Sequence, residues 1–231
     1  MSEEVKKMFA DISGKYDFMN TFLSLGMHKL WRKRAVKYAG TKPGDGVLDC
    51  ASGTGDLAIE FKKIAGNSGR VIAQDFCREM LEYIKPKIAK EKIDIEIETG
   101  DVQNLNHQDN TFDISSISFG LRNLDDPIKG LKEMARVVKP EGKVVIVETG
   151  QPKKLFYMFY KIYSKYFMPI AGRLLAKNKS AYEYLPETAS KFPYGEELVE
   201  MLRETGLFSK IDFYPQTFGV AYIYIATVKQ K

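Results

Sequence analysis

Short runs rich in β-branched and other apolar residues alternate with amphipathic helical patterns along most of the chain. This alternation is the order that a parallel sheet with crossover helices requires. We therefore expect an α/β fold, Rossmann-like and doubly wound, with a mostly parallel sheet of seven strands. The expected strands are residues 46–51, 70–75, 93–99, 112–118, 143–149, 210–214 and 221–228. The first expected core helix follows the glycine loop and ends near residue 64. The other expected core helices span residues 79–89, 126–138 and 195–205.

The end of the chain departs from the parallel pattern. Only residues 215–219 join the last two strands, which is too short for a crossover helix, so these strands should form an antiparallel hairpin. We expect a single domain in four parts. These are a helical cap at residues 1–42, a cofactor-binding core at 43–150, a helical insertion facing substrate or membrane at 151–194, and a terminal helix with the hairpin at 195–231.

Length and composition restrict the class of protein. The 231 residues suffice for one such domain, and 44% hydrophobic with 28% charged residues is typical of a globular chain. No stretch has the roughly 18 uncharged apolar residues of a membrane span, and no signal-peptide core follows Ser2, so we expect a cytoplasmic protein. Cys50, Cys77 and two histidines are too few for a disulfide framework or a zinc-type cluster, so no metal is expected.

The turn after the first strand carries the residues that a nucleoside ligand approaches most closely. It contains Gly53 and Gly55, whose missing Cβ atoms allow a tight turn and a close approach to the backbone. Asp75 closes the second strand about 20 residues later, where a carboxylate accepts hydrogen bonds from a ribose diol. The run from Gly53 to Ala58 also fits the G-x-G-x-x-[GA] fingerprint, so an NAD-dependent enzyme is the competing interpretation of this loop.

Carboxylates around the loop favour S-adenosylmethionine over a dinucleotide. Asp49 precedes the glycines and Asp56 follows them, and negative charge suits an ammonium and a sulfonium better than a pyrophosphate. Asp101 follows the third strand, where it can accept from an adenine amino group, and a terminal hairpin is not a usual dehydrogenase ending. The plainer alternative makes Asp49, Asp75 and Asp101 helix caps or turn formers. Cys50, beside the loop, is expected to be a buried filler rather than a nucleophile.

Three blocks of sequence, spread over nearly the whole chain, carry a family resemblance. They are residues 8–20 (MFADISGKYDFMN) with the continuation to Trp31-Arg32, residues 117–123 (ISFGLRN), and residues 182–186 (YEYLP) with Phe192-Pro193. In these blocks the chain resembles the UbiE-type C-methyltransferases of menaquinone and ubiquinone biosynthesis. The resemblance implies a class I methyltransferase that uses S-adenosylmethionine, releases S-adenosylhomocysteine, and methylates a ring carbon of a demethylated isoprenoid quinol. Another small phenolic, lipid or RNA substrate is the alternative among enzymes, and a non-catalytic nucleotide-binding protein is the alternative outside them.

The resemblance also implies individual cofactor contacts. Carried over residue by residue, these are Thr54 in the glycine loop, Asp75 for the ribose, Asp101 and Val102 for the adenine, and Ser118 at the end of the fourth strand. Val102 and Ser118 rest on the resemblance alone. The chain departs from the family pattern at residues 106–107, 140–142 and 222–225, away from these contacts, so the identity of the quinone stays open.

Methylation of a ring carbon places demands on the residues around the substrate. The neighbouring hydroxyl must become phenolate-like, so the site needs a base for its proton and a donor or cation for the oxyanion. Arg122, which follows the fourth strand, is the predicted partner of the ring oxygen, and Asn123 is expected to help orient it. The alternative for Arg122 is a surface ion pair with Asp125 or Asp126.

For the base, His28 in the helical cap is the candidate whose unperturbed pKa lies near neutrality. Tyr16 and an activated water are its rivals. A lone histidine in an amphipathic helix is usually structural, which is the alternative interpretation of His28.

A basic and aromatic segment occupies residues 152–178. Between Gln151 and Asn178 the chain carries six cations and no acid, although its net charge as a whole is only +5. The plain interpretation is a core helix with a solvated face. The alternative is a helix at an anionic membrane surface, beside the entrance for a polyprenyl tail.

These features set the expected partners. We expect a lipid-tailed quinol as substrate and transient contact with an anionic membrane, with the protein peripheral at the inner face of the cell membrane. Aromatic residues and lysines also suit single-stranded nucleic acid, but no separate RNA-binding module accompanies them, so no nucleic-acid partner is expected. The oligomeric state stays open, with a homodimer as one option.

Overall fold

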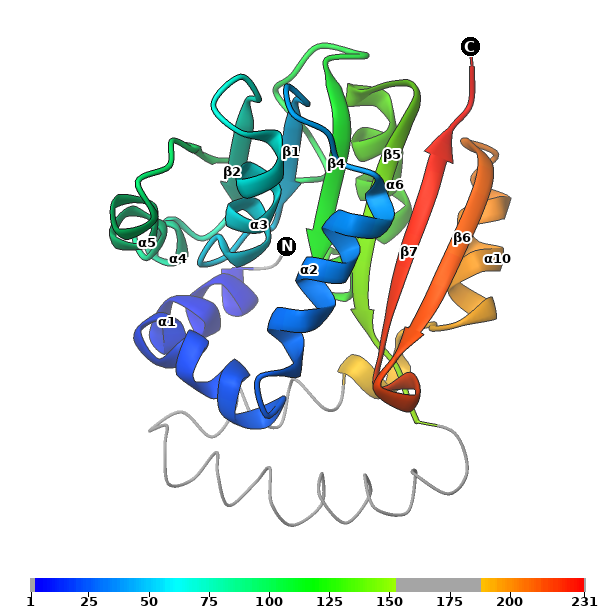
Figure 1. Ribbon diagram of the computed structural model, residues 1–231. Coiled ribbons are helices and arrows are strands. Elements are labelled where there is room, and N and C mark those ends of the chain that lie inside the picture. The colour runs from blue at the N-terminus through cyan, green and yellow to red at the C-terminus, as the bar shows by residue number, and fades with distance from the viewer. Residues whose placement is uncertain (1–2, 153–187, 231) are drawn as a thin grey trace.

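The computed structural model describes residues 3–152 and 188–230, and its centre is one sheet of seven strands (Figure 1). The strands are β1 (Val47–Cys50), β2 (Val71–Asp75), β3 (Glu96–Thr99), β4 (Phe112–Ser118), β5 (Val138–Thr149), β6 (Phe208–Gln216) and β7 (Ala221–Val228). Their order across the sheet is β3-β2-β1-β4-β5-β7-β6. Strands β1 to β5 pair in parallel, whereas β7 pairs antiparallel with both β5 and β6. The expected fold class, including the antiparallel hairpin at the end of the chain, is confirmed.

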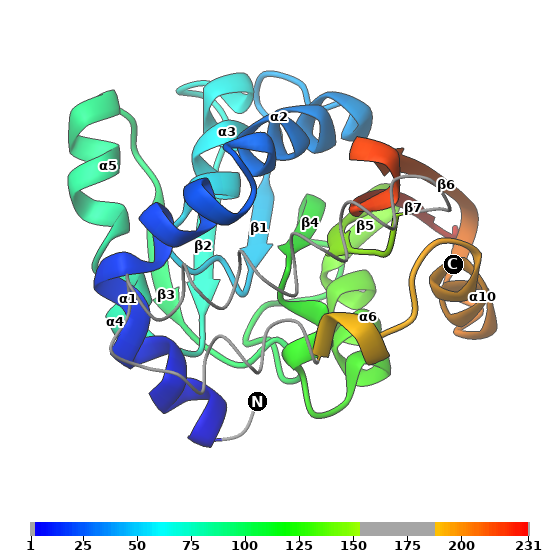
Figure 2. The same ribbon diagram turned by 90° about the horizontal axis from the view of Figure 1, so that it is seen from below.

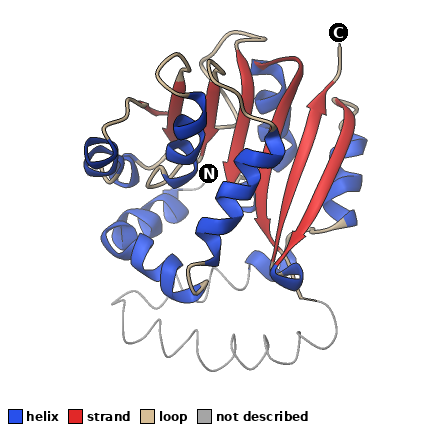
Figure 3. Ribbon diagram, viewed as in Figure 1, coloured by secondary structure: helices blue, strands red, loops and turns tan. Residues whose placement is uncertain are grey.

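Helices cover both faces of the sheet (Figures 2 and 3). The described helices are α1 (Glu3–Leu23), α2 (Met27–Ala39), α3 (Asp56–Ala65), α4 (Arg78–Leu81), α5 (Ile84–Glu91), α6 (Pro127–Val137) and α10 (Glu196–Glu204), with short 3₁₀ turns η1 (Leu121–Asn123) and η3 (Thr217–Gly219). Helices α2 and α3 lie on one face, and α6 and α10 lie on the other. Helix α1 crosses the edge formed by the carboxyl ends of the parallel strands (Figure 1).

The sheet is buried on both faces, which explains why its central strands read as continuous apolar runs. Val145 and Val147 of β5 belong to the core beneath α2 and α3. Val144 and Ile146 of the same strand belong to the core beneath α6 and α10. Because successive side chains of a strand point to opposite faces, one strand contributes to both cores.

Several boundaries differ from the sequence prediction. Strand β3 begins at Glu96 rather than residue 93, β6 spans Phe208–Gln216 rather than residues 210–214, and two larger differences have local causes. The expected helix over residues 79–89 is two helices, α4 and α5, separated after Leu81. Pro86 has no N–H to donate to the carbonyl of Glu82, and its ring crowds that carbonyl, so a continuous helix is broken there. Strand β5 begins at Val138 rather than Lys143, because the predicted turn at residues 140–142 lies within the strand as an irregularity, with Glu141 at φ 64°.

Two sequence expectations concern membranes and the helical insertion. Within the described residues, no helix combines the length and the apolar character needed to cross a bilayer. Most of the expected insertion at 151–194, and nearly all of the basic aromatic segment at 152–178, lies outside the described residues.

Candidate functional site at the carboxyl ends of the strands

A small cavity lies where α1 packs against the carboxyl ends of the parallel strands. The residues that line it from the sheet side include Ala51, Gly53, Asp75, Ser118, Gly120 and Asn123. Phe9 and Tyr16 of α1 line it from the opposite side. The cavity measures about 30 Å³, which is room for about one water molecule. Helix α1 is therefore closed over the strand ends in this structure.

The glycine loop adopts the conformation that its sequence predicts. Gly53 and Gly55 have φ angles of 59° and 79°, in the left-handed region that other residues avoid. At Gly55 a Cβ atom would also lie 2.7 Å from Cγ1 of Ile84, closer than two carbon atoms can pack. Gly55 is therefore required both by the turn and by the close approach of α5.

Asp49 is turned into the protein. Its Oδ1 accepts a hydrogen bond from the Ser116 hydroxyl at 2.6 Å, and its Oδ2 accepts one from the Ser52 hydroxyl at 2.6 Å. Burial raises the pKa of Asp49 to about 6, although these hydrogen bonds act in the opposite direction. In this structure the carboxyl group thus ties the glycine loop to β4.

Asp75 lines the cavity and also fixes the loops around it. Its Oδ2 accepts from the Gly53 N–H at 2.8 Å, and its Oδ1 accepts from the Cys77 N–H at 2.8 Å. Burial raises its pKa, and hydrogen bonds from the backbone N–H groups of Cys77, Gly53 and Phe76 oppose that shift. The carboxylate keeps acceptor capacity for a further donor, because its two oxygens together can accept about four hydrogen bonds.

Asp101 and Val102 follow β3, beyond the described residues that line the cavity. The Asp101 carboxylate accepts from the backbone N–H of Gln103 at 3.0 Å and from its side-chain amide. Val102 is buried in the core beneath α6. Asp101 therefore has the geometry of a turn former, with lone pairs left for a further donor.

Ser118 and Asn123 lie at the end of β4 and in the turn that follows it. The Ser118 hydroxyl oxygen is buried and has no hydrogen-bond partner in this structure. Asn123 donates from Nδ2 to the Phe119 carbonyl at 3.2 Å. A buried polar atom without a partner is costly, so Ser118 marks a position where a ligand atom would be stabilising.

Arg122 forms a buried ion pair with Glu148 at the end of β5. The two side chains are 5% and 1% exposed, so the pair is shielded from solvent. Glu148 Oε1 also accepts from the Thr149 N–H at 2.8 Å. Arg122 Nε and Glu148 Oε2 are both buried and have no hydrogen-bond partner within residues 3–152 and 188–230. The sequence prediction did not name Glu148, although a carboxylate at a strand end is the same signal that identified Asp75.

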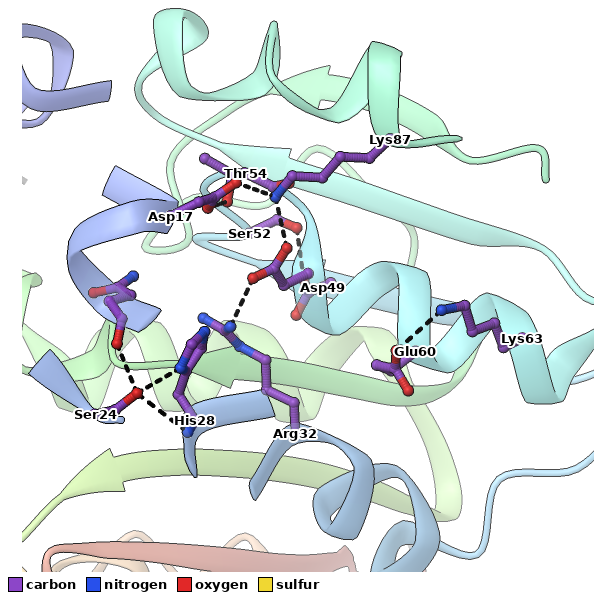
Figure 4. A network of polar contacts seen from close by, with 12 residues as sticks. Asp17, Ser24, His28, Arg32, Asp49, Ser52, Thr54, Glu60, Lys63 and Lys87 are labelled. Carbon is purple, nitrogen blue, oxygen red and sulfur yellow. Dashed lines mark hydrogen bonds and ion pairs between the residues drawn. The ribbon is translucent and has the colours of Figure 1, made fainter. Parts of the chain in front are cut away.

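A cluster of ion pairs and hydrogen bonds clamps α1 to the glycine loop (Figure 4). Asp17 of α1 accepts from the Thr54 hydroxyl at 2.5 Å and pairs with Lys87 of α5 at 2.6 Å. Lys87 and Arg32 also hold Asp56, at 2.6 Å and 2.8 Å. Burial alone would raise the pKa of Asp56, but the two cations lower it overall. Thr54 is thus occupied by the protein itself while α1 is closed.

His28 lies near this cluster at the start of α2 (Figure 4). The Ser24 hydroxyl donates its only proton to the Asn20 carbonyl at 2.6 Å, so its oxygen accepts from Nδ1 of His28 at 2.6 Å. This fixes the tautomer with Nδ1 protonated and leaves Nε2 as an acceptor. Burial and the nearby Arg32 lower the pKa of His28 to about 4, so the imidazole is neutral at physiological pH.

Comparison with known proteins gives a consistent result. A family model described as the ubiE/COQ5 methyltransferase family matches residues 1–228. A ubiquinone/menaquinone biosynthesis C-methyltransferase UbiE of Bdellovibrio bacteriovorus is 48% identical over 228 residues, covering 98% of this chain and 97% of that protein. A demethylmenaquinone methyltransferase of Bacillus cereus is 42% identical, covering 96% and 94%. The family resemblance seen in the sequence is confirmed.

Solved structures share the fold at much lower identity. A putative S-adenosylmethionine-dependent methyltransferase of Methanococcus maripaludis has a TM-score of 0.70 at 19% identity, covering 100% of this chain and 98% of that chain. An S-adenosylmethionine-dependent methyltransferase of Thermotoga maritima, described as a possible histamine N-methyltransferase, has a TM-score of 0.68 at 19% identity, covering 96% and 99%. At this level of identity the likeness establishes the fold.

Proposed function

Because the chain belongs to the ubiE/COQ5 methyltransferase family, we propose that it methylates a ring carbon of a demethylated isoprenoid quinol, with S-adenosylmethionine as methyl donor. The observation that carries the proposal is the match to this family over residues 1–228, together with the names of relatives at 42% to 48% identity. Those names include both menaquinone and ubiquinone biosynthesis, so naphthoquinol and benzoquinol substrates are both tested below.

The residues at the strand ends fit S-adenosylmethionine chemically. The unpartnered Ser118 hydroxyl and the free lone pairs of Asp75 face one cavity. The glycine backbone at Gly53 lets a ligand approach closely. The cavity of about 30 Å³ is far too small for the whole molecule, so binding requires Phe9 and Tyr16 of α1 to move outward.

We assign the contacts of the cofactor as follows. Asp75 accepts from the ribose hydroxyls, Asp101 and Val102 hold the adenine, and Ser118 bonds a polar group at the end of β4. Asp49 shapes the glycine loop formed by Gly53, Thr54 and Gly55, whose backbone lies against the amino-acid portion. Opening of α1 also frees Thr54, because its present partner is Asp17 of that helix.

Arg122 provides electrostatic stabilisation of the substrate. Its Nε is a buried donor without a partner, so it can donate to the ring oxygen that becomes phenolate-like. Glu148 is a positioning residue, because its Oε1 accepts from the guanidinium and holds it in place. Asn123, bonded to the Phe119 carbonyl, fixes the turn that carries Arg122.

Proton transfer completes the reaction. Bound S-adenosylmethionine supplies an electrophilic methyl group on a sulfonium. The ring hydroxyl gives its proton to a base, for which we propose His28 through Nε2, and the ring carbon then bonds to the methyl carbon as the carbon–sulfur bond breaks. The methylated carbon then gives its own hydrogen as a proton to water, which restores the aromatic ring, and the proton held by the base returns to the ring oxygen, so that one proton is released overall. A pKa of about 4 makes His28 a weak base, so its role depends on close alignment with the hydroxyl.

One assay separates the candidate substrates. The purified protein is incubated with methyl-tritiated S-adenosylmethionine and, in separate reactions, with reduced demethylmenaquinone, a demethoxyubiquinol-type benzoquinol, a simple phenol and bulk RNA. We expect radioactivity in one or both quinols and none in the RNA or phenol. Label in the phenol or RNA alone would refute the proposed substrate, and label in none would favour a protein that only binds the nucleoside.

We also propose that the protein works in the cytoplasm and is peripheral at the inner face of the membrane. Its substrate carries a lipid tail, and residues 152–178 combine aromatic side chains with an excess of cations. Co-sedimentation with liposomes tests this assignment. Binding should rise with the fraction of anionic lipid, and binding that is independent of anionic lipid would contradict it.

A further inference from the structure

A second cavity lies on the outer face of the helical layer, between α2, α3 and α5. It measures about 290 Å³, and among the described residues it shares no lining residue with the cavity at the strand ends. Six cationic side chains line it, namely Lys29, Arg32, Lys33, Lys63, Lys87 and Lys90. The acidic residues in its lining are Asp56, Glu60 and Glu91, so the cavity has an excess of positive charge.

The three acids are already paired with three of the cations; Figure 4 shows the pair of Glu60 and Lys63. Asp56 pairs with Arg32 and Lys87, as described above. Lys63 pairs with Glu60 at 3.2 Å and with Glu91 at 3.5 Å. No carboxylate of the lining is left for the other lysines.

The remaining positive groups have no ion-pair partner among the described residues. They are Lys29 and Lys33 on α2 and Lys90 on α5, so the unpaired lysines of the lining come from two helices. Arg32, which is already paired with Asp56, also belongs to the lining; its side chain is 7% exposed, and its buried Nε has no hydrogen-bond partner among the described residues. A buried guanidinium nitrogen without an acceptor is costly, and like charges around one cavity repel. An anion with several acceptor oxygens would relieve this repulsion by pairing with the unpaired lysines of the lining.

We propose that this groove binds a phosphate-bearing anion. The ammonium groups of Lys29, Lys33 and Lys90 are available to the anion from two helices, and the Arg32 guanidinium adds to the positive charge of the lining. A volume of about 290 Å³ is close to the lower limit of small-molecule pockets and accepts a group larger than orthophosphate, such as a glycerophosphate or a diphosphate. The ligand is thus either a free phosphate compound or the headgroup of an anionic phospholipid.

The site does not depend on the methyltransferase assignment, because none of its lysines has a proposed role with the cofactor or the quinol. The experiment uses the full chain and the double variant Lys33→Gln/Lys90→Gln. A matched control is Lys37→Gln/Lys85→Gln, which removes one lysine from each of the same two helices, outside the groove lining. All four lysines are exposed, so both variants should fold.

The first arm measures thermal unfolding with orthophosphate or pyrophosphate, against potassium chloride at equal ionic strength. At a concentration about ten times the dissociation constant, the midpoint should rise by roughly 3 to 6 °C for the wild type and the control. The groove variant should lose most of that shift. The second arm measures binding to vesicles of phosphatidylglycerol and of phosphatidylcholine, where the groove variant should bind phosphatidylglycerol at least several-fold more weakly than the control.

The two arms identify the source of the phosphate. If the groove variant loses only the thermal shift with phosphate, the ligand is a free phosphate compound. If it loses only the binding to phosphatidylglycerol vesicles, the ligand is a lipid headgroup. If it loses both, the site accepts either. The proposal is overturned if the groove variant matches the control in both arms. It is equally overturned if the control loses as much as the groove variant, since binding would then reflect net charge alone. No methyl acceptor is present, so the outcome is separate from that of the transfer assay.

Discussion

The substitution Glu148→Gln tests whether the buried ion pair holds Arg122 in its working position. Glu148 is 1% exposed and Arg122 is 5% exposed, so neutralising the acid leaves a guanidinium charge without compensation in the protein interior. Removing one partner of such a pair costs about 3 to 5 kcal/mol of unfolding free energy. Glutamine keeps an oxygen that accepts from the Thr149 N–H, so we expect a loss of unfolding free energy near the lower end of this range. For a chain of this length, about 3 kcal/mol lowers the melting temperature by roughly 6 to 12 °C.

The same substitution should affect turnover more than substrate binding. A misplaced oxyanion donor costs about 100-fold or more in kcat, and we expect a much smaller change in KM. The assays are thermal unfolding and transfer of tritiated methyl groups under saturating quinol. As a control, Glu200→Gln removes the partner of Arg203 in a pair whose side chains are 60% and 56% exposed, and it should change stability by less than about 1 kcal/mol.

A double variant separates the catalytic role from the structural one. Replacing Arg122 and Glu148 together by methionine removes both charges, and such replacements are often neutral or stabilising. We expect this variant to regain most of the stability that Glu148→Gln loses and to stay inactive. If it retained activity, or if Glu148→Gln left both stability and kcat unchanged, the reasoning about this pair would be refuted.

Three further substitutions test other parts of the account. Gly55→Ala should lower the free energy of unfolding by about 1 to 2 kcal/mol for the left-handed backbone, and by a further amount through the contact with Ile84. Gly40→Ala, at φ 70° with open space around it, should show only the first of these two losses. Urea unfolding measures both variants, and equal losses would argue against the contact. Burial raises the pKa of Asp49 from 3.8 to about 6, so the folded state holds the proton more tightly and wild-type stability falls by roughly 3 kcal/mol as pH rises through this window. Asp49→Asn should remove that part of the slope, and an unchanged slope would show that the carboxyl is not responsible. With a pKa of about 4 for His28, kcat should decline as pH drops toward 4, and His28→Gln should be slower and lack that decline; superimposable profiles would remove the histidine from the mechanism.

The fold was predictable because its determinants are local. Strand runs, a glycine turn and amphipathic helices are all readable within short windows, and the length of residues 215–219 fixes the antiparallel hairpin. The two largest boundary differences arise where a proline at position 86 and an irregularity at Glu141 modify an otherwise regular pattern. Such interruptions change where an element begins or ends without changing the order of the sheet.

The site was predictable in position but not in its contacts. Asp49 and Asp75 lie at the expected strand ends, yet much of their hydrogen-bonding capacity is used on Ser116, Ser52 and backbone amides. The bond from Thr54 to Asp17 spans 37 residues and the pair between Arg122 and Glu148 joins two strand ends, so no local pattern encodes them.

The most direct test of the central claim identifies the position of the transferred methyl group. Reduced demethylmenaquinone and the demethoxyubiquinol-type benzoquinol are each incubated with the protein and S-adenosylmethionine, and the products are analysed by mass spectrometry and proton NMR. We predict that at least one quinol gains a methyl group on a ring carbon and that S-adenosylhomocysteine forms in equal amount. Methylation on a quinol oxygen, or no methylated quinol while the protein demonstrably binds S-adenosylhomocysteine, would contradict the account.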